Sequence, residues 1–342
     1  MAMTKILITG GLGYISSNSI IELLKNDFEI IVIDNLSNCT IEILSRLKEL
    51  TSGRIEFHEM DIRNNSELDS FFSAQEISSV IHYAGLKSVS ESTKSPIKYY
   101  DNNVSGTISL LNSMVKADVK NLVFSSSATV YGVPNKLPIS ESEPRSTTNP
   151  YGRSKLMVEQ ILEDLAIADP SWNIACLRYF NPVGAHKSGL IGEDPKGTPN
   201  NIMPYISQVA IGKKEKLRVF GNDYPTIDGT GVRDFIHVTD LAKGHVAALK
   251  YLFSNEKVGF CPFNLGRGEG ISVLQLVNAF EQASGRTIPY EFVDRRPGDV
   301  AECYADPTLA NTKLDWKAEL GIKEMCEDAW RWQKNNPNGY RQ

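Results

Sequence analysis

The feature that most constrains this chain is a regular alternation of short apolar runs with helical patterns in its first half. Apolar runs occupy residues 6–9, 30–33 and 79–82, and helical patterns cover residues 17–25 and 41–50 between them. Strands that are apolar on both faces and alternate with helices are typical of a parallel sheet covered on both sides. The sequence therefore predicts an α/β fold with a doubly wound parallel sheet. Further strands are expected at residues 55–58 and 122–124, with a helix at residues 104–116.

The composition of the chain and its pattern of expected elements change near residue 180. The stretch 181–201 is rich in Gly, Pro and Asn and is expected to be a loop. Beyond it, short strands such as residues 217–220 mix with helices near residues 239–250 and 272–282. We therefore expect a doubly wound (Rossmann) domain at residues 1–180 and a smaller mixed α/β domain at residues 181–342, with segments of the second domain crossing back to the first.

Composition excludes several classes of protein. The 342 residues carry a formal net charge of −5, which argues against a general nucleic-acid binder. No apolar run reaches the roughly 18 residues that a membrane span needs, and no signal-peptide pattern precedes the first strand. The cysteines are odd in number and form no CxxC pair, and the histidines lack metal-ligand spacing. We therefore expect a cytoplasmic protein with no membrane association and no bound metal.

A glycine-rich turn follows the first expected strand and leads into the first helix. Gly10 and Gly13 would let backbone N–H groups approach a pyrophosphate at the positive end of that helix. Asp34 ends the second strand about 20 residues later, where a carboxylate can bind both ribose hydroxyls of an adenosine and repel a 2′-phosphate. Ser16 stands where a third glycine is usual, and its small side chain is expected to leave the turn intact with a slight shift. Together these features predict NAD as the cofactor.

A Tyr-x-x-x-Lys pair provides the candidate chemistry. Pro150 can start a helix, and Tyr151 and Lys155 then share one face of it. A lysine cation beside a phenol lowers the tyrosine pKa, so Tyr151 could accept a proton near neutral pH. Ser127 lies at the expected carboxyl end of a strand, where ligands of open α/β sheets bind, and could hydrogen-bond to a reacting hydroxyl.

The turn, the serine and the Tyr-x-x-x-Lys pair together resemble the extended short-chain dehydrogenase/reductase family. Within it, five segments are similar to the UDP-glucose 4-epimerases: residues 84–87, 99–103, 125–132, 177–186 and 231–238. The resemblance covers nearly the whole chain and its motifs are specific. It implies interconversion of UDP-glucose and UDP-galactose through a transient 4-keto sugar, with hydride held on bound NAD.

In that family Tyr151 would take the proton of the sugar 4-hydroxyl, Lys155 would bond the nicotinamide ribose, and Ser127 would hold the 4-oxygen. The resemblance implies that NAD contacts Gly10, Gly13, Tyr14, Ile15, Asp34, Asn35, Leu36, Ser37, Asn38, Cys39, Asp61, Ile62, Tyr83, Ala84, Gly85, Leu86, Lys87, Asn102, Ser127, Tyr151, Lys155 and Phe180. These residues place the NAD site in the first domain.

The second domain would bind the UDP-sugar. UDP is negatively charged, so Arg233 and Arg296 are the natural clamps on its diphosphate. The resemblance extends the expected substrate site to Ser127, Tyr151, Asn181, Asn200, Asn201, Ile202, Arg218, Val219, Phe220, Arg233, Arg296, Asp299 and Cys303.

Cys303 bears on the range of substrates. It lies in a segment, residues 296–303, that ends in tyrosine in family members restricted to glucose and galactose. A thiol in place of a phenol ring frees room for an acetamido group beside the sugar C2. We therefore expect activity on UDP-GlcNAc and UDP-GalNAc as well.

Two alternatives remain open. A nucleotide-sugar 4,6-dehydratase would need a carboxylate just after the strand-end serine, but Ala128 and Thr129 follow Ser127. A non-catalytic NAD or nucleotide-sugar sensor would be expected to lack Tyr151 or Lys155, and both are present. Helices in residues 104–116 and 154–165 form the dimer interface of the related enzymes, so the resemblance also implies a homodimer; their apolar positions could equally belong to the core.

Overall fold

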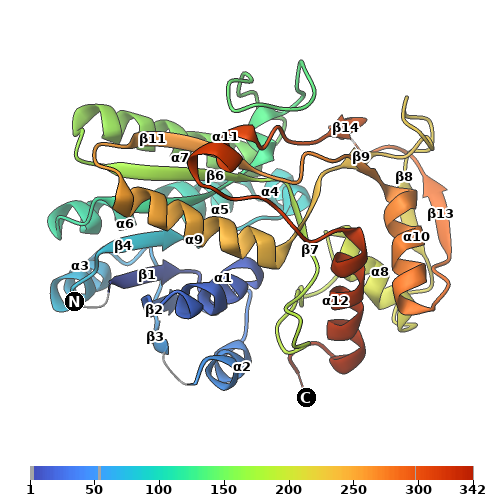
Figure 1. Ribbon diagram of the computed structural model, residues 1–342, viewed down its shortest axis with the longest axis horizontal. Helices are drawn as coiled ribbons and strands as arrows, with labels where there is room; N and C mark the ends of the chain where they lie inside the picture. The colour runs from blue at the N-terminus through green and yellow to red at the C-terminus, as the bar shows by residue number, and fades with distance from the viewer. Residues whose placement is uncertain (1–3, 53–54, 297, 342) are drawn as a thin grey trace.

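The computed structural model describes residues 4–52, 55–296 and 298–341. Its main feature is a seven-stranded sheet in the order β11-β6-β5-β4-β1-β2-β3, in which neighbouring strands run parallel (Figure 1). The strands are β1 (Lys5–Thr9), β2 (Glu29–Asp34), β3 (Ile55–Glu59), β4 (Ser79–His82), β5 (Asn121–Ser127), β6 (Asn173–Tyr179) and β11 (Gly259–Leu265). The predicted doubly wound α/β fold is confirmed.

Helices cover both faces of this sheet, as its continuously apolar strands require. One face packs on α1 (Tyr14–Lys25), α2 (Glu42–Thr51) and α9 (Val238–Ser254), and the other on α3 (Asn65–Ala74), α6 (Gly106–Lys116) and α7 (Pro150–Ala168). The chain winds outward from β1 in both directions, so β1 and β4 flank the point where the strand order reverses. Ligands of such sheets bind at the carboxyl ends of the strands beside that point.

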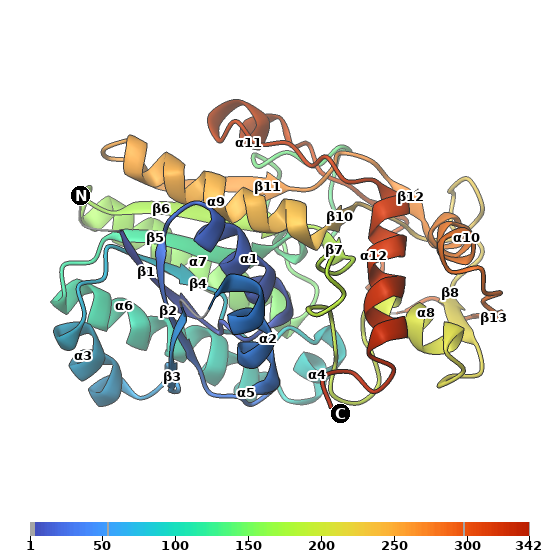
Figure 2. The same ribbon diagram turned by 60° about the horizontal axis from the view of Figure 1, so that its bottom comes forward.

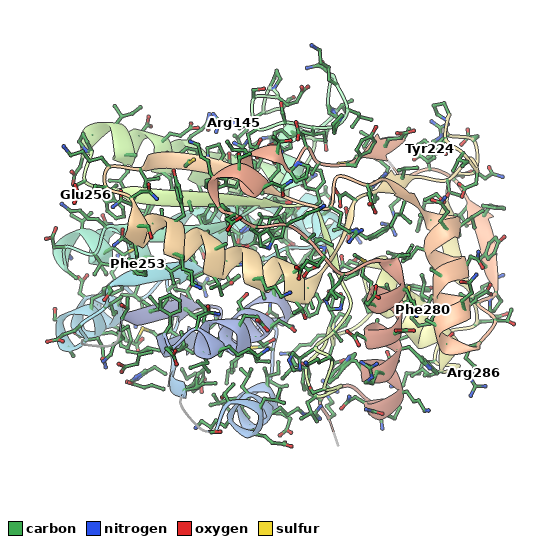
Figure 3. All side chains as sticks on the ribbon, viewed as in Figure 1. Arg145, Tyr224, Phe253, Glu256, Phe280 and Arg286 are labelled. Carbon is green, nitrogen blue, oxygen red and sulfur yellow. The ribbon has the colours of Figure 1, made fainter. Side chains whose placement is uncertain are left out.

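Most of the smaller elements that complete the second half of the chain lie on the right of Figure 1. Three small sheets pair β8 (Leu217–Phe220) with β13 (Tyr290–Val293), β9 (Val232–Arg233) with β12 (Ile271–Ser272) and β14 (Glu302–Cys303), and β7 (Asn181–Val183) with β10 (Phe235–His237). The helices are α8 (Ile202–Ala210), α10 (Val273–Ser284), α11 (Thr308–Lys313) and α12 (Ile322–Asn335). In Figure 3 Phe280 points from α10 toward α12, where its ring meets that of Trp330 edge-on at 6.2 Å.

The chain returns to the large sheet after residue 180. Strand β11 adds to the edge of the sheet beside β6, and α9 packs along α1 on the same face of the sheet (Figure 2). The large sheet is therefore completed by residues from the second half of the sequence. No helix among the described residues has both the length and the apolar character to cross a membrane.

Several element boundaries differ from the sequence-based expectation. Helix α1 begins at Tyr14 rather than residue 17, because Gly13 is extended and serves as its N-cap. A π-helical segment, Asp101–Ser105, precedes α6, and α4 (Val89–Lys94) and α5 (Pro96–Tyr100) come before it. Strand β7 lies within the stretch expected to be a loop, and β5 runs on to Ser127, after which Ala128–Tyr131 form a 3₁₀ turn.

Candidate active site

The glycine-rich turn joins β1 to α1 in a form that only small residues allow. Gly10 has φ of +64°, and a Cβ there would lie 2.7 Å from the backbone of Ala84. Its N–H donates to the carbonyl of Ile33 at 2.8 Å. The Ser16 hydroxyl donates back to the Gly10 carbonyl at 2.6 Å. The turn is therefore intact with serine at the third position, and the N-terminus of α1 is open to an anionic ligand.

Asp34 sits at the end of β2 next to this turn. Its carboxylate accepts hydrogen bonds from the backbone N–H groups of Leu12 at 3.1 Å and Leu36 at 2.9 Å. The side chain is buried, so these donors fix where both oxygens point. A carboxylate held in this place fits the ribose of an adenosine.

A cavity of about 610 Å³ opens at the carboxyl ends of the parallel strands. All of the predicted cofactor residues line it except Leu36, Asp61, Ser127 and Phe180. Leu36 packs on the core cluster beneath α1 and α2, and Asp61 forms an ion pair with Arg63 at 2.7 Å. Ser127 lies just beyond the lining residue Ser125, and Phe180 belongs to a separate apolar cluster that includes Tyr131.

Tyr151 and Lys155 stand in the first turns of α7. Asn149 fixes the start of this helix, because its side chain accepts from the Gly152 N–H at 2.9 Å. Lys155 is buried, and its Nζ donates to the Ser125 carbonyl at 2.6 Å. Burial lowers the pKa of Lys155 to about 8. Lys155 lines the cavity and gives up its proton more readily than an exposed lysine does.

The pKa of Tyr151 departs from the expectation. Burial raises the pKa of the phenol above its usual value, although the Ser127 hydroxyl and the positive charge of Lys87 act to lower it. The ammonium group of Lys155 is directed at the Ser125 carbonyl, and its expected effect on Tyr151 stays a prediction. Lys87 reaches the site from the loop after β4, beside the ring of Tyr14 at 5.9 Å.

Three arginines gather in the second half of the chain. The guanidinium of Arg296 lies 3.8 Å from the centre of the Phe220 ring and that of Arg218 lies 5.5 Å from it. Arg233 approaches Asp299 at 3.9 Å. Burial lowers the pKa of Arg296, and its positive neighbours act in the same direction. Clustered guanidiniums of this kind provide a site for a diphosphate.

The other predicted substrate residues lie outside the cavity lining. Asn181 opens β7, and Asn200, Asn201 and Ile202 lead into α8. The Val219 side chain is buried in the core of the second half. Of the predicted substrate set, Tyr151 alone lines the cavity among the described residues.

Cys303 connects the arginine cluster with the end of β5. It pairs with Arg233 in the register of β14 and β9. Its side chain packs on the apolar cluster that contains Phe180, Tyr131 and Ala128, the residue after Ser127. Burial raises the pKa of its thiol to about 11, so this cysteine is neutral at physiological pH.

Sequence reasoning missed one wall of the cavity. Residues 192–197 and the C-terminal residues 337–341 line it, together with Trp332 of α12 and Tyr179 at the end of β6. The Gly-Pro-rich composition of residues 192–197 was a signal for a loop, but nothing in it pointed to a ligand. No group of His, Cys, Asp or Glu side chains in the described parts of the chain is arranged to hold a metal ion.

Similarity to known proteins assigns this chain to a family. The UDP-glucose 4-epimerase of Bacillus subtilis (strain 168) is 57% identical over 336 residues, which cover 98% of both chains. This chain belongs to the UDP-glucose 4-epimerase family. A family model described as GDP-mannose 4,6 dehydratase also matches residues 7–329, so the chain shares that wider group's fold.

Two solved structures of UDP-glucose 4-epimerases match this fold closely. The enzyme from Bifidobacterium longum, in complex with NAD⁺ and UDP, is 51% identical with a TM-score of 0.94, covering 98% of this chain and 100% of that one. The enzyme from Stenotrophomonas maltophila, with bound NAD and formylated UDP-arabinopyranose, is 47% identical with a TM-score of 0.95, covering 98% and 99%. The glycine turn, the fixed Asp34 carboxylate and the cavity beside them fit NAD in this chain.

Proposed function

We propose that this protein interconverts UDP-glucose and UDP-galactose by epimerisation at C4, with NAD held in the large cavity. The observation that carries the proposal is the position of Tyr151: it lines the cavity that fits NAD, beside the strand-end Ser127. Its membership of the UDP-glucose 4-epimerase family, at more than half sequence identity to a curated relative, supports the same reaction.

When bound, NAD supplies the acceptor and donor of the C4 hydrogen, so that the sugar passes through a 4-ketone. The residues of the chain handle the proton and the geometry. Tyr151 removes the proton of the 4-hydroxyl and later returns it, and Ser127 holds the 4-oxygen within reach. Lys87 favours the phenolate form of Tyr151, and the buried Lys155 bonds the nicotinamide ribose.

The UDP group would bind in the second half of the chain. Arg218, Arg233 and Arg296 hold the diphosphate, and Asp299 accepts from the uridine ribose. The ring of Phe220 offers a surface near uracil. We therefore propose residues 1–180 as the NAD-binding domain and residues 181–342 as the UDP-sugar domain, with β11 and α9 returning to the first.

The sugar pocket supports a wider range of substrates. The small Cys303 side chain faces the apolar cluster next to Ser127, where a tyrosine ring would fill the space. We propose that the enzyme accepts UDP-GlcNAc and UDP-GalNAc in addition to the glucose and galactose pair.

Exposed apolar side chains on α5, α6 and α7 support a homodimer. Ile97 of α5, Ile108 and Val115 of α6, and Met157 of α7 are exposed by 77%, 41%, 53% and 39%. Covering such side chains with a second copy would remove them from water. All five cysteines are unpaired, which favours a reducing compartment, the cytoplasm.

The test is direct conversion. Purified protein is incubated with UDP-galactose, with and without added NAD, and UDP-glucose is measured by NMR. Epimerisation by the parent and a loss of about 10²-fold or more in Tyr151→Phe are expected. A 4-keto-6-deoxy product would indicate a dehydratase, and binding of NAD without any conversion would indicate a sensor.

A further inference from the structure

The hydroxyl oxygen of Ser127 is held by two donors from one neighbouring residue. It accepts a hydrogen bond from the backbone N–H of Thr129 at 3.2 Å and one from the Thr129 hydroxyl, Oγ1, at 3.0 Å. Ser127 thereby caps the 3₁₀ turn Ala128–Tyr131, which follows β5. A hydroxyl oxygen has two lone pairs and carries one proton. Both lone pairs are used here, so the proton of Ser127 is the part that remains for a ligand.

Thr129 packs against the helix that carries Tyr151. A Cβ atom on Gly152, the residue after Tyr151, would lie 3.0 Å from the Thr129 carbonyl oxygen and 3.4 Å from its Oγ1. Glycine at position 152 thus lets the first turn of α7 come close to Thr129. The β-branch of threonine restricts rotation about its Cα–Cβ bond, which helps to keep the hydroxyl directed at Ser127. Thr129 therefore lies next to both Ser127 and the turn that presents Tyr151.

The main chain that leads to Ser127 is fixed from the same helix. Nζ of Lys155 donates to the Ser125 carbonyl at 2.6 Å, and the Ser126 hydroxyl donates to Oε1 of Glu159 at 2.5 Å. Lys155 and Glu159 stand about one turn apart on α7, and both are buried. Rotation of its own hydroxyl is therefore the main freedom left to Ser127, and the two bonds from Thr129 remove it.

We propose that Thr129 is a positioning residue that makes Ser127 a hydrogen-bond donor, and not an acceptor, toward the reacting oxygen of the substrate. The proposal rests on the proposed epimerase function and deepens it. Ser127 keeps its own proton throughout the reaction and directs it at the oxygen on C4 of the sugar.

The donor role decides the route of the sugar proton. As C4 is oxidised, its hydrogen leaves with the bonding electron pair for NAD, and the hydroxyl proton leaves for the Tyr151 phenolate. Ser127 cannot take that proton, because neither lone pair of its oxygen is free. Its hydrogen bond strengthens as negative charge gathers on the C4 oxygen, so it stabilises the transition state more than the bound sugar. When the ketone is reduced, Tyr151 returns the proton to the C4 oxygen directly.

The experiment measures kcat and KM for UDP-galactose in Thr129→Val, with the NAD-loaded protein. Valine keeps the branched shape of threonine but removes the hydroxyl donor. The Ser127 proton is then no longer directed, so kcat should fall roughly tenfold while KM stays within about twofold. Thr129→Ser keeps a hydroxyl and should restore most of kcat. If Ser127 had to accept the sugar proton, removing a competing donor would leave kcat unchanged or raise it.

A double-mutant cycle separates an action through Ser127 from a direct contact between Thr129 and the ligand. In a Ser127→Ala background the Thr129 hydroxyl has lost its acceptor, so Thr129→Val should cause no further fall in kcat. Slow variants are followed with protein in excess over the sugar. The Kd for UDP, measured by calorimetry, should be the same in the parent and in Thr129→Val, because the proposed diphosphate site is formed by Arg218, Arg233 and Arg296.

Thr51→Val is the matched control. The Thr51 hydroxyl also has a partner, the Leu47 carbonyl at 2.6 Å, but Thr51 is buried in α2 and is not among the described residues that line the cavity. Its replacement should leave kcat and KM unchanged. Thr129→Ala removes the same hydroxyl as Thr129→Val without placing a second methyl group against Gly152, and it should lower kcat as well.

A parent-like kcat in both Thr129→Val and Thr129→Ala overturns the proposal. So does an equal fall in kcat when Thr129 is replaced in the Ser127→Ala background, or a failure of Thr129→Ser to restore turnover. Any of these results leaves the epimerase function standing, provided that the parent interconverts the two sugars and Tyr151→Phe does not. A parent protein that converts neither sugar overturns the proposed function itself.

Discussion

Arg178 of β6 forms a bidentate ion pair with Glu159 of α7, the helix that carries Tyr151. The two bonds, from Nε and Nη2 of Arg178, are 3.0 and 2.7 Å long, and both side chains are buried. Burial acts to raise the pKa of Glu159, but the guanidinium more than offsets this and the pKa is lowered. The same carboxylate accepts from Ser126, the residue before Ser127.

Breaking this pair should therefore be costly. Glu159→Gln leaves the charge of Arg178 buried without compensation and should lower the free energy of unfolding by about 3–5 kcal/mol. Urea unfolding followed by circular dichroism measures the loss. The control is Glu163→Gln on the same helix, whose side chain is 31% exposed and pairs with Arg145, and which should cost less than about 1 kcal/mol. Equal losses in the two variants would contradict this assignment.

Cys303→Tyr should narrow the range of substrates. Cys303 packs beside Phe180 and Tyr131, so a phenol ring there would occupy the space that we assign to an acetamido group. Turnover of UDP-GalNAc should fall roughly tenfold or more, while turnover of UDP-galactose is retained. Cys326→Ala, in the core of the second half, should leave the ratio of the two rates unchanged. Unchanged rates on both sugars in Cys303→Tyr would refute the pocket argument.

The local parts of the fold and the site were predictable from the sequence. The strands β1, β2, β4 and β5 each contain an apolar run, and the glycine turn, Asp34 and the Tyr151–Lys155 spacing all lie within a few residues of the element that positions them. In these cases neighbouring residues determine the local structure, so the strands, the turn and the positions of these side chains can be predicted from one sequence.

The parts that depend on distant contacts were not predictable. Strand β11 joins the sheet from residue 259 because its partner is β6, which no local pattern reveals. Residues 192–197 look like an ordinary loop until α12 and Tyr340 hold them against the cavity. Burial raises the pKa of Tyr151, and the Tyr-x-x-x-Lys spacing alone does not show how much of the phenol the distant parts of the chain cover.

His82 should make the stability of the protein depend on pH. Its Nδ1 is bonded to the Thr9 hydroxyl at 2.7 Å and its Nε2 to that of Thr107 at 2.9 Å, at the end of β4. Thr107 donates its own proton to the Asn103 carbonyl, so it must accept from Nε2–H of His82. Burial lowers the pKa of His82 to about 3.

The unfolded chain binds this proton near pH 6.5, and the folded one does not. The contribution of neutral His82 to stability is therefore present above about pH 6.5 and is lost as pH falls below it. Urea midpoints measured between about pH 7.5 and pH 5 should decline, and His82→Gln should reduce the decline. The slope that remains belongs in part to His245, whose pKa burial lowers to about 4. A parent-like slope in His82→Gln would contradict the prediction.

The C-terminal residues should govern how firmly NAD is retained. The Tyr340 hydroxyl donates to the Gly192 carbonyl and accepts from the Gly192 N–H, both at 3.0 Å. The guanidinium of Arg46 lies 4.9 Å from the centre of the Tyr340 ring and donates to Asn336 at 2.6 Å, which ties this segment to α2. These contacts close the wall of the cavity at residues 192–197.

Tyr340→Phe keeps the ring over which Arg46 lies but removes both hydrogen bonds, at a cost of about 0.5–1.5 kcal/mol for each. The wall should open more often, so NAD should dissociate several-fold faster, while turnover with saturating NAD is retained. The NAD that remains after gel filtration, measured by its absorbance in the denatured eluate, reports the difference. Tyr290→Phe, at an exposed position on β13, is the control and should retain NAD as the parent does. Retention in Tyr340→Phe equal to that of the control would show that the wall stays closed without this tyrosine.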